Sequence, residues 1–437
     1  MSRRPNFLFL FPDQHRGDWM PYPEHIFRSR FGMEPLPLRM PNVEALMKRG
    51  VTFTRAVTPS PLCAPARACL AAGLRYELSP VKNNQQNYPL DCKTFYSVLK
   101  ESGYEVGGVG KFDLHKASHW WGLDGWIDDL GKLGFTVAID NAGKMDAIAS
   151  GQQEPKDPYM KYLYDRGLAE LHLRDMKGRK KSTHPTELPE EAYCDNWLSA
   201  NGVNMIRNFP QNKPWFLVVN FTGPHSPFDV TKRMREAWRH VDFPLPHEST
   251  DDPAQSVAIR QNYAAMLENI DRNIGLMLRE VEKRGELDHT IVIYASDHGE
   301  MLGDFDKYGK VRPERGSVHV PLVVAGPGVR ENICSDALVE LQDLARTIVE
   351  YAGADMPEAV DSLSLKPILE GTAESHREVQ ISALNGWKMA SDGEYKLIIE
   401  NGKEPRLYHL PSDPWENRNV ARQHEDVVKR LQAQLTS

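Results

Sequence analysis

Cys63 lies in the segment of this sequence whose residue types and spacing point most directly to chemistry. Pro65 and Arg67 follow it, and a run of small residues continues to Gly73. Because proline is tolerated in the first turn of a helix, we expect Cys63 at or just before a helix N-terminus, where backbone N–H groups favour negative charge. Arg67 lies about one turn later and can reach back to the same place. Without these neighbours, a lone cysteine would be interpreted as a buried packing residue.

Four polar residues at the ends of two separate apolar runs can hold a cation. Asp13 and Gln14 follow the first of these runs. Asp297 and His298 follow the other. Carboxylate and amide oxygens with one imidazole suit Ca²⁺ and also permit Mg²⁺ or Mn²⁺. An Asp-His pair alone would as readily be a helix cap, but the combination predicts one divalent metal, Ca²⁺ in preference to the other two.

Short apolar runs alternate with helical patterns, and these elements would position the polar residues. The runs cover residues 6–11, 105–109, 215–221 and 290–296, and an amphipathic pattern over 259–281 predicts the clearest helix. This alternation is typical of an α/β fold with a large, mostly parallel sheet sandwiched by helices. Ligands bind beyond the carboxyl ends of such strands, so the polar residues that end the runs should converge on one crevice.

Two segments depart from this alternation. Residues 120–190 are rich in Gly, Pro and charge clusters, and we expect an irregular insertion that walls the crevice. Nearer the C-terminus, apolar runs around an Asn401-Gly402 turn predict a β-hairpin, and the apolar face of residues 425–435 predicts a final helix. We therefore predict a catalytic domain over residues 1–375 and a smaller C-terminal antiparallel β plus helix subdomain over 376–437.

The composition fits a large globular protein and disfavours several other classes. With 41% hydrophobic and 26% charged residues, the chain can bury a large core. A formal charge of -7 with scattered basic residues argues against nucleic-acid and membrane partners. The apolar stretch 7–11 is too short for a signal-peptide core, and no run approaches the ~20 residues of a membrane span. Five cysteines, an odd number, fit a reducing compartment, so we expect a cytoplasmic protein.

The Cys-x-Pro-x-Arg segment, placed after an N-terminal strand that ends in Asp, resembles the signature of the sulfatase family, formylglycine-dependent enzymes of the alkaline phosphatase superfamily. The resemblance extends along nearly the whole chain in the family's order. The further matching segments are Asp13-Gln14, Gly110-Lys111, Pro224-His225-x-Pro227, Ser296 to Glu300, Tyr308-Gly309-Lys310, His319-Val320-Pro321, Leu407-Tyr408, Asp413-Pro414 and Glu416-Asn417.

The resemblance implies hydrolysis of a sulfate monoester to an alcohol and inorganic sulfate. A formylglycine-generating enzyme would oxidise Cys63 before the chain folds. One oxygen of the hydrated aldehyde at position 63 would bind the metal, which adds Cys63 to the ligand set, and would attack sulfur. The same resemblance implies that Arg67 orients the formylglycine. It implies that Lys111 and Lys310 bind the sulfate oxygens, and that His225 protonates the leaving alcohol. Single lysines of this kind would otherwise be solvated surface charges.

Two positions depart from the family pattern. Gln14 occupies a place where many members have Asp, and this variant also resembles phosphonate monoester and phosphodiester hydrolases of the superfamily. Sulfatases commonly read Gly-Lys-Trp-His, whereas here Lys111 is followed by Phe112, Asp113, Leu114 and His115. Either Asp113 or the displaced His115 must then accept the proton of the second gem-diol oxygen. We expect His115 in this role, so that His115→Ala traps a sulfated adduct and Asp113→Ala does not.

Other functions stay open beside the sulfatase. The first is a phosphonate monoester or phosphodiester hydrolase on the same scaffold, although two lysines around the anion favour sulfate. The second is a catalytically silent binding protein of the same fold. The expected partner is a small anionic sulfated compound, with a sulfated sugar as one candidate because Trp120, Trp121 and Trp126 can stack on a ring or, equally, pack in the core. We expect no nucleic acid and no membrane, and an oligomer is compatible with the sequence.

Overall fold

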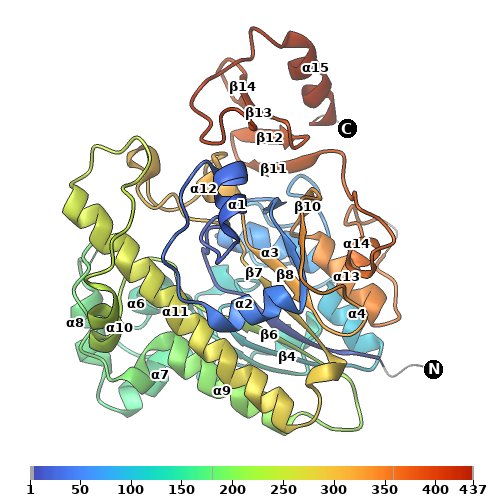
Figure 1. Cartoon of the computed structure of the whole chain (residues 1–437). Helices are drawn as coiled ribbons and strands as arrows, with labels where there is room; N and C mark the ends of the chain where they lie inside the picture. The colour runs from blue at the N-terminus through green and yellow to red at the C-terminus, as the bar shows by residue number, and fades with distance from the viewer. Residues whose placement is uncertain (1–3, 180, 358, 436–437) are drawn as a thin grey trace.

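The computed structural model describes residues 4–179, 181–357 and 359–435. A mixed eight-stranded sheet forms its centre (Figure 1). The spatial order is β5 (Val137–Asp140), β4 (Glu105–Gly110), β6 (Trp215–Asn220), β1 (Asn6–Leu10), β7 (Thr290–Ala295), β8 (Leu322–Ala325), β2 (Gly50–Phe53) and β9 (Ile333–Ser335). The first five of these run parallel, and β8 is antiparallel to both of its neighbours. The predicted α/β class is confirmed, and the four predicted strands lie side by side as β4, β6, β1 and β7.

Both faces of this sheet are covered by helices, as the apolar strands require. In β1, Leu8 and Leu10 face one core while Phe7 and Phe9 face the other. The first core contains residues of α2 (Pro41–Lys48), α9 (Cys194–Asn208) and α11 (Pro253–Lys283). The second core contains residues of α3 (Cys63–Ala72), α4 (Phe95–Glu101) and α13 (Asp343–Tyr351). Figure 1 shows the two helical layers on opposite sides of the strands.

The segment 120–190, which we expected to be irregular, contains regular elements. It supplies the edge strand β5, which pairs with β4, and four short helices. Several of the Gly and Pro positions that suggested irregularity lie at helix ends; Asp157, for example, caps the helix that Pro158 begins. The helices are α5 (Asp128–Lys132), α6 (Gly143–Ser150), α7 (Pro158–Asp165) and α8 (Ala169–Met176).

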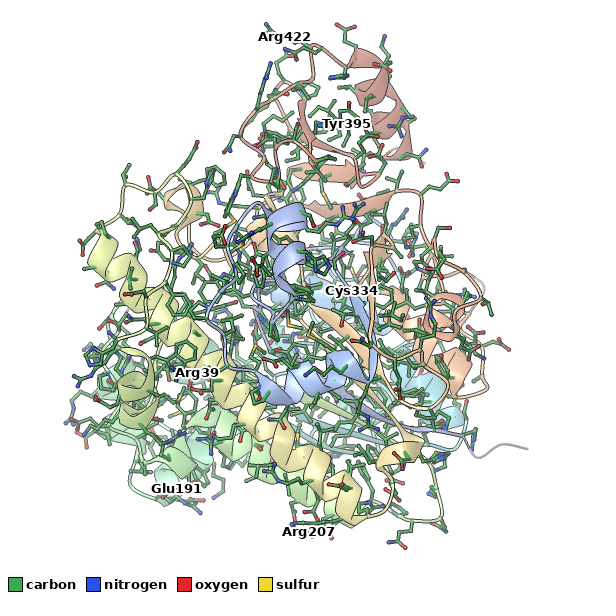
Figure 2. All side chains as sticks on the ribbon, in the orientation of Figure 1. Arg39, Glu191, Arg207, Cys334, Tyr395 and Arg422 are labelled. Atoms are coloured by element: carbon green, nitrogen blue, oxygen red, sulfur yellow. The ribbon has the colours of Figure 1, made fainter. Side chains whose placement is uncertain are left out.

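A four-stranded antiparallel sheet and a final helix form a smaller C-terminal unit. The strands are β11 (Gln380–Leu384), β12 (Trp387–Ser391), β13 (Tyr395–Glu400) and β14 (Arg406–His409), and the helix is α15 (Glu425–Gln434). The predicted hairpin forms as β13 and β14, whereas the sequence did not predict β11 and β12. Val427 and Leu431 of α15 pack on this sheet. Figure 2 places Tyr395 in this unit and Arg207 at the opposite end of the molecule. No described helix has the length and hydrophobicity that a bilayer crossing requires.

Candidate active site

Cys63 begins helix α3, which is buried along its whole length. The Cys63 thiol is 2% exposed, and its Sγ lies 3.3 Å from Nε2 of His298. The next backbone N–H, that of Ala64, donates to Oδ1 of Asn84. The sequence therefore places a thiol where the N-terminal end of a helix favours negative charge.

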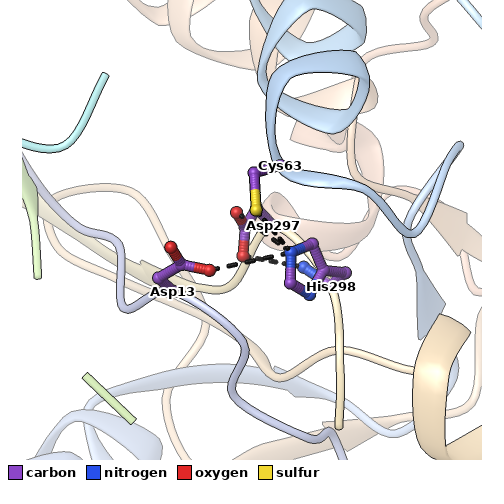
Figure 3. A group of neighbouring side chains, drawn as sticks. All are labelled: Asp13, Cys63, Asp297 and His298. Atoms are coloured by element: carbon purple, nitrogen blue, oxygen red, sulfur yellow. Dashed lines mark hydrogen bonds and ion pairs between the residues drawn. The ribbon is translucent and has the colours of Figure 1, made fainter. Parts of the chain in front are cut away.

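Four donor side chains meet at the carboxyl ends of β1 and β7 and the start of α3. They are Asp13, Cys63, Asp297 and His298, and one ligand atom from each lies within 4.8 Å of the others (Figure 3). All four are buried. Oδ1 of Asp13 is buried without a hydrogen-bond partner among the described residues. A buried carboxylate oxygen left without a donor is expensive, so the cluster fits a divalent cation.

Glu300 fixes the orientation of the Gln14 side chain. Its Nε2 donates to Oε2 of Glu300, and its Oε1 accepts from Nζ of Lys310 at 2.6 Å. Its backbone adopts a left-handed conformation with φ of 69°, and its N–H donates to Oδ1 of Asp297. Glu300 also accepts from the N–H of Gly309, directly before Lys310. Glu300 thus positions an amide oxygen and a lysine together.

We expect Glu300→Gln to weaken metal binding by about 10- to 100-fold, because loss of a residue that orients a ligand has effects of this size. A neutral amide in place of the carboxylate would present an N–H₂ group either to Gln14 or to the N–H of Gly309. The measurement is metal affinity by competition with a chelator. Glu24→Gln, at an exposed ion pair, is the control. Equal affinities in the two variants would show that Glu300 does not orient the site.

Three basic side chains lie near Cys63. Nζ of Lys111 pairs with Asp13, and Nζ of Lys310 lies 2.7 Å from Nε2 of His225. Arg67 contacts Asp297 at 3.0 Å through Nε, and its Nη1 donates to the carbonyl of Lys111 and to Oδ1 of Asn220. Arg67 is therefore held between the ends of three strands. Asn220 was not among the predicted site residues, although its position at the end of a predicted strand was a usable signal.

These charges shift the titration of the buried groups. Burial and the Asp13 carboxylate raise the pKa of the Cys63 thiol, but Lys111, Lys310 and His298 more than offset them, so the pKa lies well below its usual value. Burial alone would raise the pKa of Asp13. The neighbouring cations, Lys111 above all, outweigh burial, so this pKa lies well below its usual value. Burial and the adjacent Lys310 lower the pKa of His225, which is therefore neutral at pH 7. The site stabilises negative charge at position 63.

Asp113 and His115 point to different surroundings. Oδ2 of Asp113 lies 3.1 Å from Nζ of Lys111, and the side chain is fully buried. Nδ1 of His115 instead lies 3.6 Å from Asp129 of α5. Among the contacts of the described residues, His115 has none with Lys111 or Cys63. The structure brings the other predicted catalytic and metal residues together. It places Asp113 beside Lys111, on a backbone with a positive φ of 55°, and His115 beside Asp129.

Comparison with known proteins shows which family the chain belongs to. The sulfatase family model matches residues 5–354, most of the chain. The chain belongs to the sulfatase family. A second model, described as the C-terminal part of N-sulphoglucosamine sulphohydrolase, matches residues 303–437.

Relatives of this sulfatase cover it almost completely. The arylsulfatase of Clostridium perfringens is 25% identical over 97% of this chain and 91% of its own. The choline-sulfatase of Rhizobium meliloti is 25% identical over 99% of this chain and 85% of its own. With the family match, these relatives make the protein a sulfuric ester hydrolase of the alkaline phosphatase superfamily.

Solved structures share the fold of this sulfatase. The phosphonate monoester hydrolase of Agrobacterium radiobacter has a TM-score of 0.77 at 24% identity and covers 99% of this chain and 94% of its own. A structure in complex with its substrate D-glucosamine-2-N,6-O-disulfate has a TM-score of 0.76 at 19% identity and covers 99% and 97%. At these identities the likeness shows the fold.

Proposed function

We propose that the matured chain hydrolyses a sulfate monoester with a formylglycine nucleophile made from Cys63 and one divalent cation, Ca²⁺ in preference to Mg²⁺ or Mn²⁺. The observation that carries this proposal is the buried thiol at a helix N-terminus, within 4.8 Å of two carboxylates and an imidazole. Asp13, Gln14, Asp297 and His298 would hold the cation together with the oxygen at position 63. When bound, the cation supplies positive charge that withdraws electrons from the sulfuryl group and the nucleophile.

The chemistry of the donor set supports oxidation of Cys63. Ca²⁺ and Mg²⁺ are hard cations that prefer oxygen, and a thiolate is a soft ligand suited to other metals. Replacing Sγ with an oxygen would make the set consist of oxygens and one imidazole. The two neighbouring carboxylates then match a hard divalent cation in charge.

The first step of the proposed reaction transfers the sulfuryl group to position 63. One hydroxyl oxygen of the hydrated aldehyde forms a bond to sulfur, and the bond from sulfur to the ester oxygen breaks. Lys111 and Lys310 would bind the sulfuryl oxygens and offset their negative charge. The attacking hydroxyl passes its proton to the neutral imidazole of His225, beside Lys310, and the imidazolium then returns a proton to the leaving ester oxygen.

The second step releases sulfate and restores the aldehyde. The remaining hydroxyl loses its proton, its oxygen forms a double bond to carbon, and the bond between carbon and the sulfate oxygen breaks with its electron pair on sulfate. We assign the proton to Asp113, because its carboxylate lies beside Lys111 while His115 contacts Asp129. This assignment replaces our expectation for His115.

Asp113→Ala should therefore accumulate the sulfated adduct at position 63 after substrate is added, and His115→Ala should turn over without it. The physical reason is that loss of the proton acceptor slows elimination and leaves the first step intact. The measurement is the mass of the peptide that contains position 63 in each variant. An adduct in His115→Ala alone would return the role to the histidine.

The choice between sulfate and phosphonate esters needs a direct test. Two lysines around the anion support sulfate, and the phosphonate monoester hydrolase with the same fold supports the alternative. We expect kcat/KM to be highest for a member of a panel of sulfated sugars and aryl sulfates, at least about tenfold above matched phosphonate monoesters and phosphodiesters. A higher kcat/KM for the phosphorus esters would overturn the sulfatase proposal in favour of the alternative.

A further inference from the structure

A line of alternating charges leads from the metal cluster to helix α6 of the insertion. Asp13 pairs with Lys111, and Lys111 lies 3.1 Å from Asp113. Asp113 in turn lies 3.2 Å from Nζ of Lys116, which lies 2.7 Å from Oδ2 of Asp146 in α6. Neither Lys116 nor Asp146 takes part in the reaction steps proposed for the site.

Asp113 depends on a second cation. Its side chain is 0% exposed, and a buried carboxylate is stable only when paired. Lys111 also pairs with Asp13, so its one ammonium group is shared between the carboxylates of Asp13 and Asp113. Lys116 supplies the additional positive charge, with its Nζ within 3.3 Å of both oxygens of Asp113.

Lys116 is arranged to hold Asp113 and not to bind an anionic substrate. Its side chain is 10% exposed and contacts two carboxylates. Burial lowers its pKa, but Asp113 and Asp146 contribute to an overall rise, so the amine stays charged. A cation compensated twice by carboxylates offers little attraction to a further anion.

Helix α6 borders both lysines of this line. Gly143 at its start has a positive φ of 70°, and a Cβ there would lie 2.7 Å from Cδ of Lys111. Asp146, one turn later, holds Lys116. The same short helix therefore packs against the stem of one lysine and fixes the ammonium of the other.

We propose that Lys116, anchored by Asp146, is a positioning residue that holds the Asp113 carboxylate against Lys111 for the elimination step. This inference rests on the proposed function. It makes helix α6 of the insertion part of the support of the active site.

The test is a double-mutant cycle on the full-length matured protein, with kcat, KM and the adduct at position 63 as readouts. Lys116→Met removes the charge at similar length, and Lys116→Arg keeps it. Lys161→Met, at an exposed ion pair with Asp165 in the same insertion, is the matched control. We expect Lys116→Met to lower kcat by about tenfold or more with KM within about twofold, and to accumulate adduct. Lys116→Arg should recover most of kcat.

The decisive comparison uses the Asp113→Ala background. If Lys116 acts through Asp113, adding Lys116→Met there should change kcat by less than about twofold. An equal loss of kcat in both backgrounds would overturn the proposal, as would wild-type kcat in Lys116→Met. Should Lys116→Met fail to fold, Asp146→Asn replaces it in the same cycle and must show the same dependence on Asp113. If the wild type is active and Lys116→Met keeps the same kcat, only the positioning role is refuted. If the wild type is inactive on every sulfate ester, the proposed function itself is refuted.

Discussion

Cys63→Ala should lose at least about 10⁴-fold in turnover while keeping its fold, because alanine cannot be converted to an aldehyde and offers no nucleophile. The residue lies at the start of a buried helix, and its thiol lies within hydrogen-bonding distance of His298. Removing it costs little packing compared with the loss of chemistry. The measurement is kcat/KM on the best sulfate ester, together with thermal unfolding.

The matched control for this variant is Cys69→Ala in the same helix. Cys69 is also fully buried, and burial raises the pKa of its thiol to about 12, so it is an unreactive packing residue. We expect Cys69→Ala to retain turnover within a few-fold of wild type despite a comparable loss of buried volume. Similar activity in the two variants would exclude position 63 as the nucleophile.

Asp13→Asn should lower metal affinity by more than about 100-fold and remove activity at ordinary metal concentrations, because it deletes one of two carboxylates from the cluster. Prolonged chelation of the wild type should have the same effect, and added Ca²⁺, Mg²⁺ or Mn²⁺ should reverse it. Asp288→Asn, at an exposed carboxylate, is the control. Full activity in wild-type protein shown by elemental analysis to be free of metal would contradict a catalytic cation.

Metal binding should also weaken as the pH falls. Burial and Lys310 lower the pKa of His298, but the Asp297 carboxylate and Cys63 outweigh them, and the pKa lies above its ordinary value of 6.5. An imidazole binds a metal only when it is neutral, so the proton and the cation compete for it. Affinity is then highest above this raised pKa and falls as the pH drops through it.

The sequence predicted the parts of the site that depend on local pattern. Asp13 and Asp297 end apolar runs, and parallel strands carry such residues to one edge of a sheet. Pro65 predicted a helix start at Cys63, and the resemblance of the Cys-x-Pro-x-Arg segment to the sulfatase signature made Cys63 the candidate nucleophile. The long amphipathic pattern of α11 was equally clear, since its apolar face is continuous.

The sequence could not predict what depends on side-chain direction and distant packing. Asp113 contacts Lys111 from a backbone with a positive φ, and no periodicity reveals that conformation. The contact between Asp146 and Lys116 joins a helix of the insertion to the loop after β4, 30 residues apart in the chain. Strand β8 is four residues long and antiparallel to β7, and its pairing is set by tertiary packing.

The mass of the peptide containing position 63 tests the central claim most directly. The protein would be produced with and without a formylglycine-generating enzyme, and turnover of a sulfate ester would be measured on the same samples. We predict that the peptide carries an aldehyde in place of the thiol, and that turnover rises in proportion to the converted fraction. A fully active sample in which position 63 is an unmodified cysteine would contradict the account.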